Sequence, residues 1–105
     1  MSYMFNECSS LTSLNLSNFN TSNVKNMNMI FNKCTSLKEL DLSKFNTNNV
    51  KDMNHLFSKC SSLTSLNLSN FNTNNVTNME DVFSGLNENC DVITLDNQLL
   101  EKLEH

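Results

Sequence analysis

Three cysteines recur at a fixed interval, and they are the first residues whose chemistry has to be weighed. Cys8, Cys34 and Cys60 recur at a constant 26-residue interval, whereas Cys90 falls outside this spacing and is expected to be partly exposed. Metal-binding cysteines usually cluster at short spacings such as C-x2-C, which this chain lacks. Stacked repeats about 5 Å apart would bring the thiols within disulfide range. Buried free thiols acting as small apolar side chains are the leading interpretation, with a disulfide ladder and a metal site as alternatives.

Other residue types that could do chemistry are few. His55 is expected at the surface, because Met29 and Asp81 occupy its position in the neighbouring repeats. No serine or cysteine nucleophile is spaced to partner it. Glu39 and Asp41 lie at i and i+2 of a short strand, where two carboxylates could in principle share acid–base work, although polar strand-face residues are the simpler interpretation. An enzyme is disfavoured because nothing departs from the repeat to form a site. We predict no catalytic residue, no metal ligand and no cofactor.

The 26-residue interval runs through most of the chain. A fixed period of 20–50 residues is the signature of a solenoid, in which each unit stacks only on its neighbours. Copies 8–21 and 60–73 are identical in sequence, and the middle copy differs from them at no apolar position. The repeated apolar positions are Phe5, Phe31, Phe57 and Phe83; Leu14, Leu40 and Leu66; Phe19, Phe45 and Phe71; Val24, Val50 and Val76; and Met27, Met53 and Met79.

Each unit changes its period halfway. Residues 39–43 alternate polar and apolar, which predicts a short strand with one buried face. Residues 46–49 favour a turn, and Thr47 or Asn48 could cap a following helix. The apolar residues at 50, 53, 56, 57 and 60 fall within an arc of about 120° on a helix. We therefore predict an α/β repeat, a right-handed leucine-rich-repeat-like solenoid with one short parallel strand and one helix per repeat. An all-strand triangular solenoid is the alternative.

The repeat decays toward the end of the chain. Residues 1–85 are assigned to three or more tandem repeats, and Gly85 is expected to end the last repeat helix in a left-handed conformation. Residues 86–103 are assigned to a C-terminal cap with a strand at 91–95 and an amphipathic helix at 97–103 through Leu99, Leu100 and Leu103. Residues 103–105 resemble the scar of a purification tag, and we expect the chain to be a fragment of a longer repeat protein.

Composition excludes several partners. The net charge of −4 argues against nucleic acid and against an anionic membrane. No stretch approaches the roughly 20 apolar residues of a membrane span, and no signal peptide is recognised. The chain lacks Arg, Ala, Pro and Trp and is rich in Asn, a bias that indicates a low-GC genome.

The repeat resembles a known family. The pattern L-x-x-L-D-L-S-x-F-N-T-x-N-V-x-x-M-x-x-L-F-x-x-C at residues 37–60 is similar to the BspA-like leucine-rich-repeat bacterial surface proteins. More narrowly, it is similar to the repeats of nearly the same length in mycoplasma-type surface lipoproteins. The resemblance covers residues 4–85. It implies an extracellular or cell-surface protein, often lipid-anchored, that acts in adhesion or host interaction, although no lipobox or anchor is recognised in these residues.

We therefore predict a non-catalytic protein-recognition or adhesion module that binds an unknown host or cell-surface protein. A structural or antigenic spacer without a specific ligand is the alternative, favoured by the identical copies. Weak end-to-end homodimers are also expected, because open apolar ends invite pairing. The candidate partner-binding residues are those predicted on the outer sheet face: Ser13, Asn15, Ser17, Lys38, Glu39, Asp41, Ser43, Ser65, Asn67 and Ser69.

Overall fold

The computed structural model describes residues 1–103. The last two residues of the tag-like ending, 104 and 105, lie outside the described residues. Three short parallel strands form one sheet in the order β1-β2-β3, namely β1 (Glu39–Asp41), β2 (Ser65–Asn67) and β3 (Asp91–Ile93). Leu40 pairs with Leu66, and Leu66 pairs with Val92. Each step across the sheet therefore equals one full repeat interval in the sequence.

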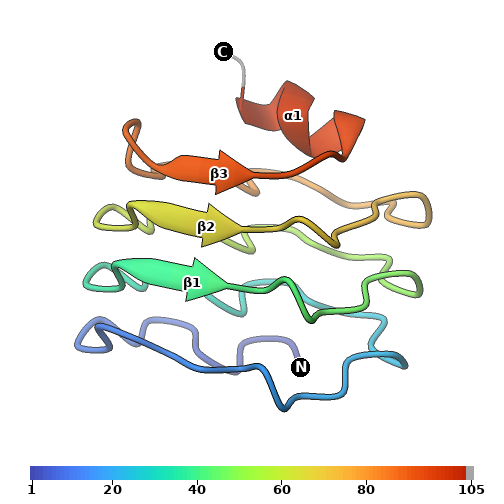
Figure 1. The fold of residues 1–105 in the computed structure, drawn as a ribbon, viewed down its shortest axis with the longest axis horizontal. Coiled ribbons are helices and arrows are strands. Elements are labelled where there is room, and N and C mark those ends of the chain that lie inside the picture. Colours follow the sequence, from blue (N-terminus) through green and yellow to red (C-terminus); the bar gives the residue numbers. More distant parts are fainter. Residues whose placement is uncertain (104–105) are drawn as a thin grey trace.

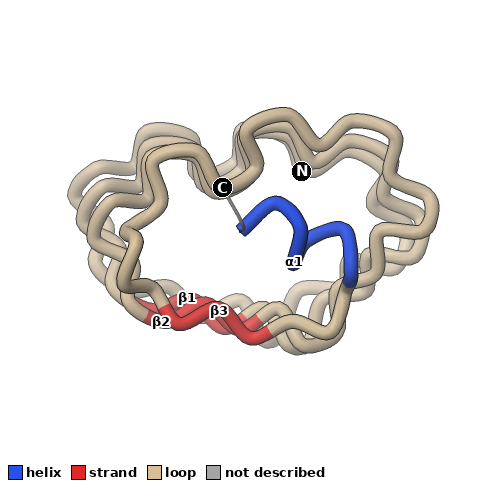
Figure 2. Tube along the Cα trace, turned by 90° about the horizontal axis from the view of Figure 1, so that it is seen from above, coloured by secondary structure: helices blue, strands red, loops and turns tan. Residues whose placement is uncertain are grey.

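The chain winds so that successive repeats lie over one another, as Figure 1 shows from the side and Figure 2 from above. Each winding of about 26 residues is called a coil here, and the coils together form the stack. The strands lie along one side of the outline, the sheet side, and irregular turns form the opposite side, the turn side. A second line of parallel bridges joins Asn26 to Asp52 and Asp52 to Asn78. Backbone hydrogen bonds between neighbouring coils therefore form on both sides of the stack.

The helix expected in each repeat is not present in the described residues. Residues 54–59 form turns, in which the N–H of Leu56 donates to the Met53 carbonyl and that of Cys60 to the Phe57 carbonyl. These three-residue steps reproduce a helical apolar spacing without a helix. His55, at φ 56°, has left-handed backbone and sends its N–H to the next coil, which interrupts any helical ladder.

Packing distances give a physical reason for the turns. Neighbouring helices pack about 8–10 Å apart, whereas paired strands lie about 4.8 Å apart. If each coil had a helix on one side and a strand on the other, neighbouring coils would be farther apart on the helix side than on the strand side. Turns that hydrogen-bond to the next coil keep the same rise on both sides of the stack.

The core runs through the centre of the stack. The phenylalanine column made of Phe5, Phe31, Phe57 and Phe83 has neighbouring ring centroids 5.7–5.9 Å apart and nearly parallel rings. Phe31 and Phe57 are fully buried, whereas Phe5, in the first coil, is half-buried. Burying such a side chain contributes about 2–3 kcal/mol, so the middle coils hold most of the apolar stabilisation.

Threonine and asparagine rows satisfy the backbone at the turns. The Thr47 hydroxyl donates to the Asn72 carbonyl at 2.9 Å and accepts from the Asn72 N–H at 2.8 Å, so it links two coils rather than capping a helix. The Asn46 side chain instead accepts from the N–H of Asn48, two residues on. Threonine hydroxyls therefore join neighbouring repeats, and the asparagine side chains mainly shape each turn, although that of Asn72 also donates to Asn48 of the preceding repeat at 3.2 Å.

The last elements fall where the sequence places a strand and a helix. Strand β3 lies within residues 91–95, and α1 (Asn97–Leu103) matches the expected helix. Gly85 has the expected left-handed backbone, at φ 74°, although it ends a turn and not a helix. Leu99 is fully buried, but Leu100 is exposed, so the apolar face of α1 is narrower than predicted. Among residues 1–103, no helix is both long and apolar enough to cross a membrane.

Candidate functional site

The outer face of the sheet carries two rows of side chains in register. Glu39, Ser65 and Asp91 form one row across the three strands. Asp41, Asn67 and Ile93 form the second row. The residues between them point inward: Leu40 and Leu66 are buried, and Val92 is half-buried. The strand-face residues named from the sequence are therefore brought together in β1 and β2.

The serines that follow the strands lie in turns at the end of this face. Ser43 is in a turn, and its N–H donates to Asp41 Oδ1 at 2.9 Å. The same local bond joins Ser17 to Asn15 and Ser69 to Asn67, each at 3.0 Å. Ser17, Ser43 and Ser69 are therefore turn residues, which corrects their predicted placement in the strands, because each one closes a turn through its own backbone. Their part in a partner-binding face stays a prediction.

The hydrogen bonds from Ser43 stabilise the charged form of Asp41. The side chain and the backbone N–H of Ser43 both stabilise the carboxylate, and the nearby Lys44 charge adds to their effect, so the pKa of Asp41 is lowered. Hydrogen bonds to the charged form always act in this direction. These interactions therefore favour the carboxylate form of Asp41 over its protonated form.

The first coil contributes less than expected. Ser13 and Asn15 are exposed, but residues 11–16 form no strand. The N–H of Lys38 reaches the carbonyl of Thr12 at 3.3 Å, and the regular ladder begins only with β1. Lys38 is itself exposed, and its carbonyl accepts from the N–H of Thr64 at 2.8 Å. It therefore lies immediately before β1, on the margin of the face.

Two face residues were missed in the sequence. Asp91 and Ile93 of β3 lie one repeat interval beyond Ser65 and Asn67, so the periodicity could have identified them. Asp91 adds a second acidic group to the row of Glu39. Ile93 is 46% exposed and gives the otherwise polar face an apolar contact.

The two buried cysteines are poor candidates for reactive thiols. Cys34 and Cys60 are buried and free, and each thiol donates to a carbonyl of the preceding coil, at Phe5 and Phe31. Burial raises the pKa of Cys34 to about 11 and that of Cys60 to about 12, so both remain protonated and poorly nucleophilic. Cys8 is half-buried, which corrects the expectation that all three repeat cysteines are buried.

His55 lies on the turn side, away from the sheet. Its side chain is about one-third exposed, and its Nε2 lies 3.9 Å from the Asp81 carboxylate. Both residues have left-handed backbone. Among residues 1–103, no three His, Cys, Asp or Glu side chains are grouped closely enough to hold a metal ion.

Comparison with known proteins gives one match. The model of a family described as Mycoplasma protein of unknown function, DUF285, matches residues 1–97. No curated protein matches the chain, and no solved structure matches it. The family's association with Mycoplasma agrees with the mycoplasma-type resemblance of the repeat. Since the match spans nearly the whole chain, the protein belongs to this Mycoplasma family of unknown function.

Proposed function

We propose that the protein is a non-catalytic recognition module of a bacterial surface protein, and that the outer face of β1–β3 contacts the partner. The observation that supports this proposal is the register of Glu39, Ser65 and Asp91. The fold requires the inward leucines between them, yet it makes no evident use of these outward side chains. A flat polar face whose side chains can vary without loss of the core is a suitable recognition surface.

We further propose that the stacked coils belong to a right-handed leucine-rich-repeat-like solenoid of the BspA-like surface proteins. Three parallel strands at the 26-residue interval, together with the hydrogen bonds between coils on the turn side, support it. On this proposal the parent protein is extracellular or held at the cell surface as a lipoprotein, and its partner is a host or neighbouring-cell protein. The function of the parent protein on this proposal is adhesion to that partner.

The face also sets the expected strength of binding. Three strands of three residues offer less than the roughly 800 Å² per partner of a standard interface. Glu39, Asp41 and Asp91 make the face acidic, and such charges govern specificity and association rate more than affinity. A basic patch on the partner is therefore expected, with a dissociation constant of about micromolar or weaker.

The test is a solid-phase binding assay of the labelled chain on an array of purified extracellular-matrix and cell-surface proteins. A variant carrying Glu39→Lys and Asp41→Lys should lose binding by about tenfold or more. A control carrying Glu7→Lys and Glu80→Lys has the same change in net charge but leaves the sheet face intact, and should bind as the parent does. Equal loss in both variants would assign the effect to net charge and reject the sheet face.

The alternative function is a structural or antigenic spacer. It is favoured by the complete identity of residues 8–21 and 60–73, since a surface under selection for a specific partner tends to diverge between copies. A spacer gives no saturable binding to any protein of the array, for the parent chain and for both variants alike.

A further inference from the structure

Every second backbone N–H on the turn side donates to the next coil. The first coil donates from Tyr3, Phe5 and Glu7, and the pattern is repeated with little change in the two coils that follow. Each acceptor carbonyl lies just short of one full repeat interval further along the chain, at distances of 2.6–3.1 Å. The later donor–acceptor pairs are Met29 to Asn54, Phe31 to Leu56, Lys33 to Ser58, His55 to Glu80, Phe57 to Val82 and Lys59 to Ser84.

The last coil presents the same donors without acceptors. Asp81, Phe83 and Gly85 occupy the equivalent positions, and Asp81 and Gly85 keep the left-handed backbone, at φ 54° and 74°. Within residues 1–103, none of their three N–H groups has a hydrogen-bond partner. An unpaired row of this kind is a template for an added segment.

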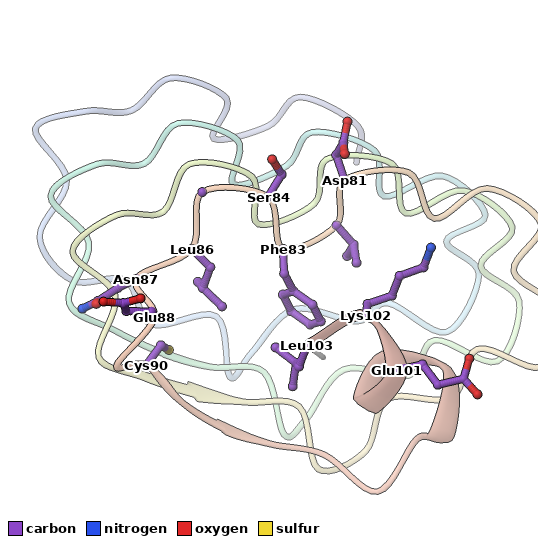
Figure 3. A pocket seen from close by; sticks show the side chains of 12 residues that line it. Asp81, Phe83, Ser84, Leu86, Asn87, Glu88, Cys90, Glu101, Lys102 and Leu103 are labelled. Carbon is purple, nitrogen blue, oxygen red and sulfur yellow. The ribbon is translucent and has the colours of Figure 1, made fainter. Parts of the chain in front are cut away.

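A cavity of about 670 Å³ lies against this row, between the turn and the C-terminal end of α1. Figure 3 shows Leu86 and Leu103 pointing into it near Phe83, with Cys90 at one end. These side chains give the cavity an apolar floor that can hold one aliphatic or aromatic side chain.

The rim of the cavity is acidic. Glu88 and Glu101 contribute two carboxylates, and Lys102 contributes one cation. The Asp81 carboxylate points away from the cavity and lies 3.9 Å from Nε2 of His55 in the preceding repeat. The rim therefore carries an excess of one negative charge, which favours a basic group on whatever lies there.

We propose that this edge binds an extended peptide segment of a partner protein that is apolar in its middle and basic at its end. The lower coils show how such a segment fits the donors. Residues 28–33 and 54–59 supply the acceptor carbonyls, carry an apolar pair at their centre and end in Lys33 and Lys59. Helix α1 lies over the remainder of the last coil (Figures 1 and 2), so the segment is a single strand and not a complete coil.

The direct test uses a blocked hexapeptide with the sequence of residues 54–59, titrated into the ¹⁵N-labelled full chain. Amide signals of Asp81, Phe83 and Gly85 should shift and saturate, whereas those of His55 and Phe57, whose donors are occupied, should not. The mirror-image peptide made of D-amino acids has the same composition and should produce no saturable shift. Equal shifts with both peptides, or the absence of shifts at these three amides, would overturn the proposal.

Hydrogen exchange tests the donor row without any ligand. The amides of Asp81, Phe83 and Gly85 should exchange at least about 100-fold faster than those of His55, Phe57 and Lys59, because only the latter are bonded to another coil. Saturating peptide should slow the first three. Slow exchange of these amides in the free chain would show that the edge is already occupied, and would refute the site.

Charge exchange tests the rim. A variant carrying Glu88→Lys and Glu101→Lys should bind the peptide about tenfold more weakly, and a peptide ending in Glu in place of Lys should recover the loss. The control carrying Glu7→Lys, Asn18→Lys and Asn70→Lys makes the same change in net charge away from the cavity and alters none of the proposed binding residues of the sheet face. If the control weakens binding equally, the rim does not select the basic end.

Discussion

The Asp96 carboxylate joins two elements at the end of the stack. It accepts from the backbone N–H of Thr73 at 2.8 Å and from its hydroxyl at 2.9 Å, and it also accepts from the N–H of Leu99 at 3.0 Å. In the coil below, the Thr47 hydroxyl makes its bonds to the backbone of Asn72. Asp96 therefore replaces the backbone of a following coil and caps the N-terminus of α1 at the same time.

Asp96→Ala should lower the free energy of unfolding by about 2–3 kcal/mol, because it removes a helix cap and leaves the Thr73 hydroxyl without its partner. Asp96→Asn keeps one carbonyl oxygen and should cost about 1 kcal/mol. Urea denaturation measures both. Asp91→Ala, at an exposed aspartate on the same strand-and-helix segment, is the control and should change stability by less than about 0.5 kcal/mol. Equal costs at positions 91 and 96 would contradict the dual role.

Substitutions at two equivalent positions with left-handed backbone should change the stability of the fold in opposite directions. Lys59 has φ 62° and Gly85, one repeat later, has φ 74°. Lys59→Gly should stabilise the chain by up to about 1 kcal/mol, since only glycine adopts this conformation without strain. Gly85→Ala should destabilise it by about 1–2 kcal/mol, because a Cβ there would also lie 3.2 Å from Lys59 Cα. Thermal unfolding compares the two, and a stabilising Gly85→Ala would refute the assignment.

Much of the fold follows from the periodicity of the sequence. The prediction of a helix in each repeat is wrong for a specific reason. Val50, Met53, Leu56, Phe57 and Cys60 are all buried, so their apolar spacing predicts the core correctly. The same spacing suits a helix and a run of three-residue turns equally well. The decision depends on where the intervening N–H groups bond, and this is a long-range property that no window of the sequence contains.

The outer face of the sheet could also be predicted only in part from the sequence pattern. The alternation around Leu40 predicts that Glu39 and Asp41 point outward, and the repeat carries this to Ser65 and Asn67. The strand ends before a turn at Ser43, whose N–H donates to Asp41, and a pattern of alternating polar residues does not reveal this turn. Asp91 was missed because the apolar pattern of the fourth copy decays while its register continues.

The phenylalanine column should show a gradient of mutational cost. Phe57→Ala should destabilise the chain by about 3–5 kcal/mol, because the ring is fully buried between two stacked neighbours. Phe5→Ala should cost clearly less, since Phe5 is half-buried and stacks on Phe31 alone among the residues described. Phe57→Leu keeps most of the volume and should cost about 1–2 kcal/mol. Urea midpoints that are equal for positions 5 and 57 would argue against a column.

Self-association is expected to be weak and end-to-end. Met4 in the first coil is 46% exposed, and Leu95 beside the last strand is 86% exposed. Apolar side chains exposed at opposite ends of the stack favour head-to-tail contacts, which do not close into a ring. Light scattering should therefore show an average mass that rises with concentration, and Met4→Lys with Leu95→Lys should suppress the rise. A constant monomer mass up to millimolar concentration would dismiss this association.

The buried thiols predict a loss of stability at high pH. Burial raises the pKa of Cys34 to about 11 and that of Cys60 to about 12, above the 9.0 of an ordinary thiol. The folded chain therefore holds more protons than the unfolded chain at any pH between these values, so stability is unaffected below about pH 8 and declines from about pH 9 upward. Each thiol can add at most about 1.4 kcal/mol per pH unit to this decline.

Urea midpoints measured between pH 8 and pH 10.5 test this decline. The informative quantity is the slope of the midpoint against pH, compared between the parent chain and a variant without the two buried thiols. The double variant Cys34→Ala and Cys60→Ala is less stable throughout but should have a shallower slope than the parent. Thiol titration at pH 8 should find Cys8 and Cys90 reacting first, Cys34 and Cys60 slowly, and four thiols after denaturation. Thiols missing in pairs and restored by reductant would instead establish a disulfide ladder and remove the basis of the pH prediction.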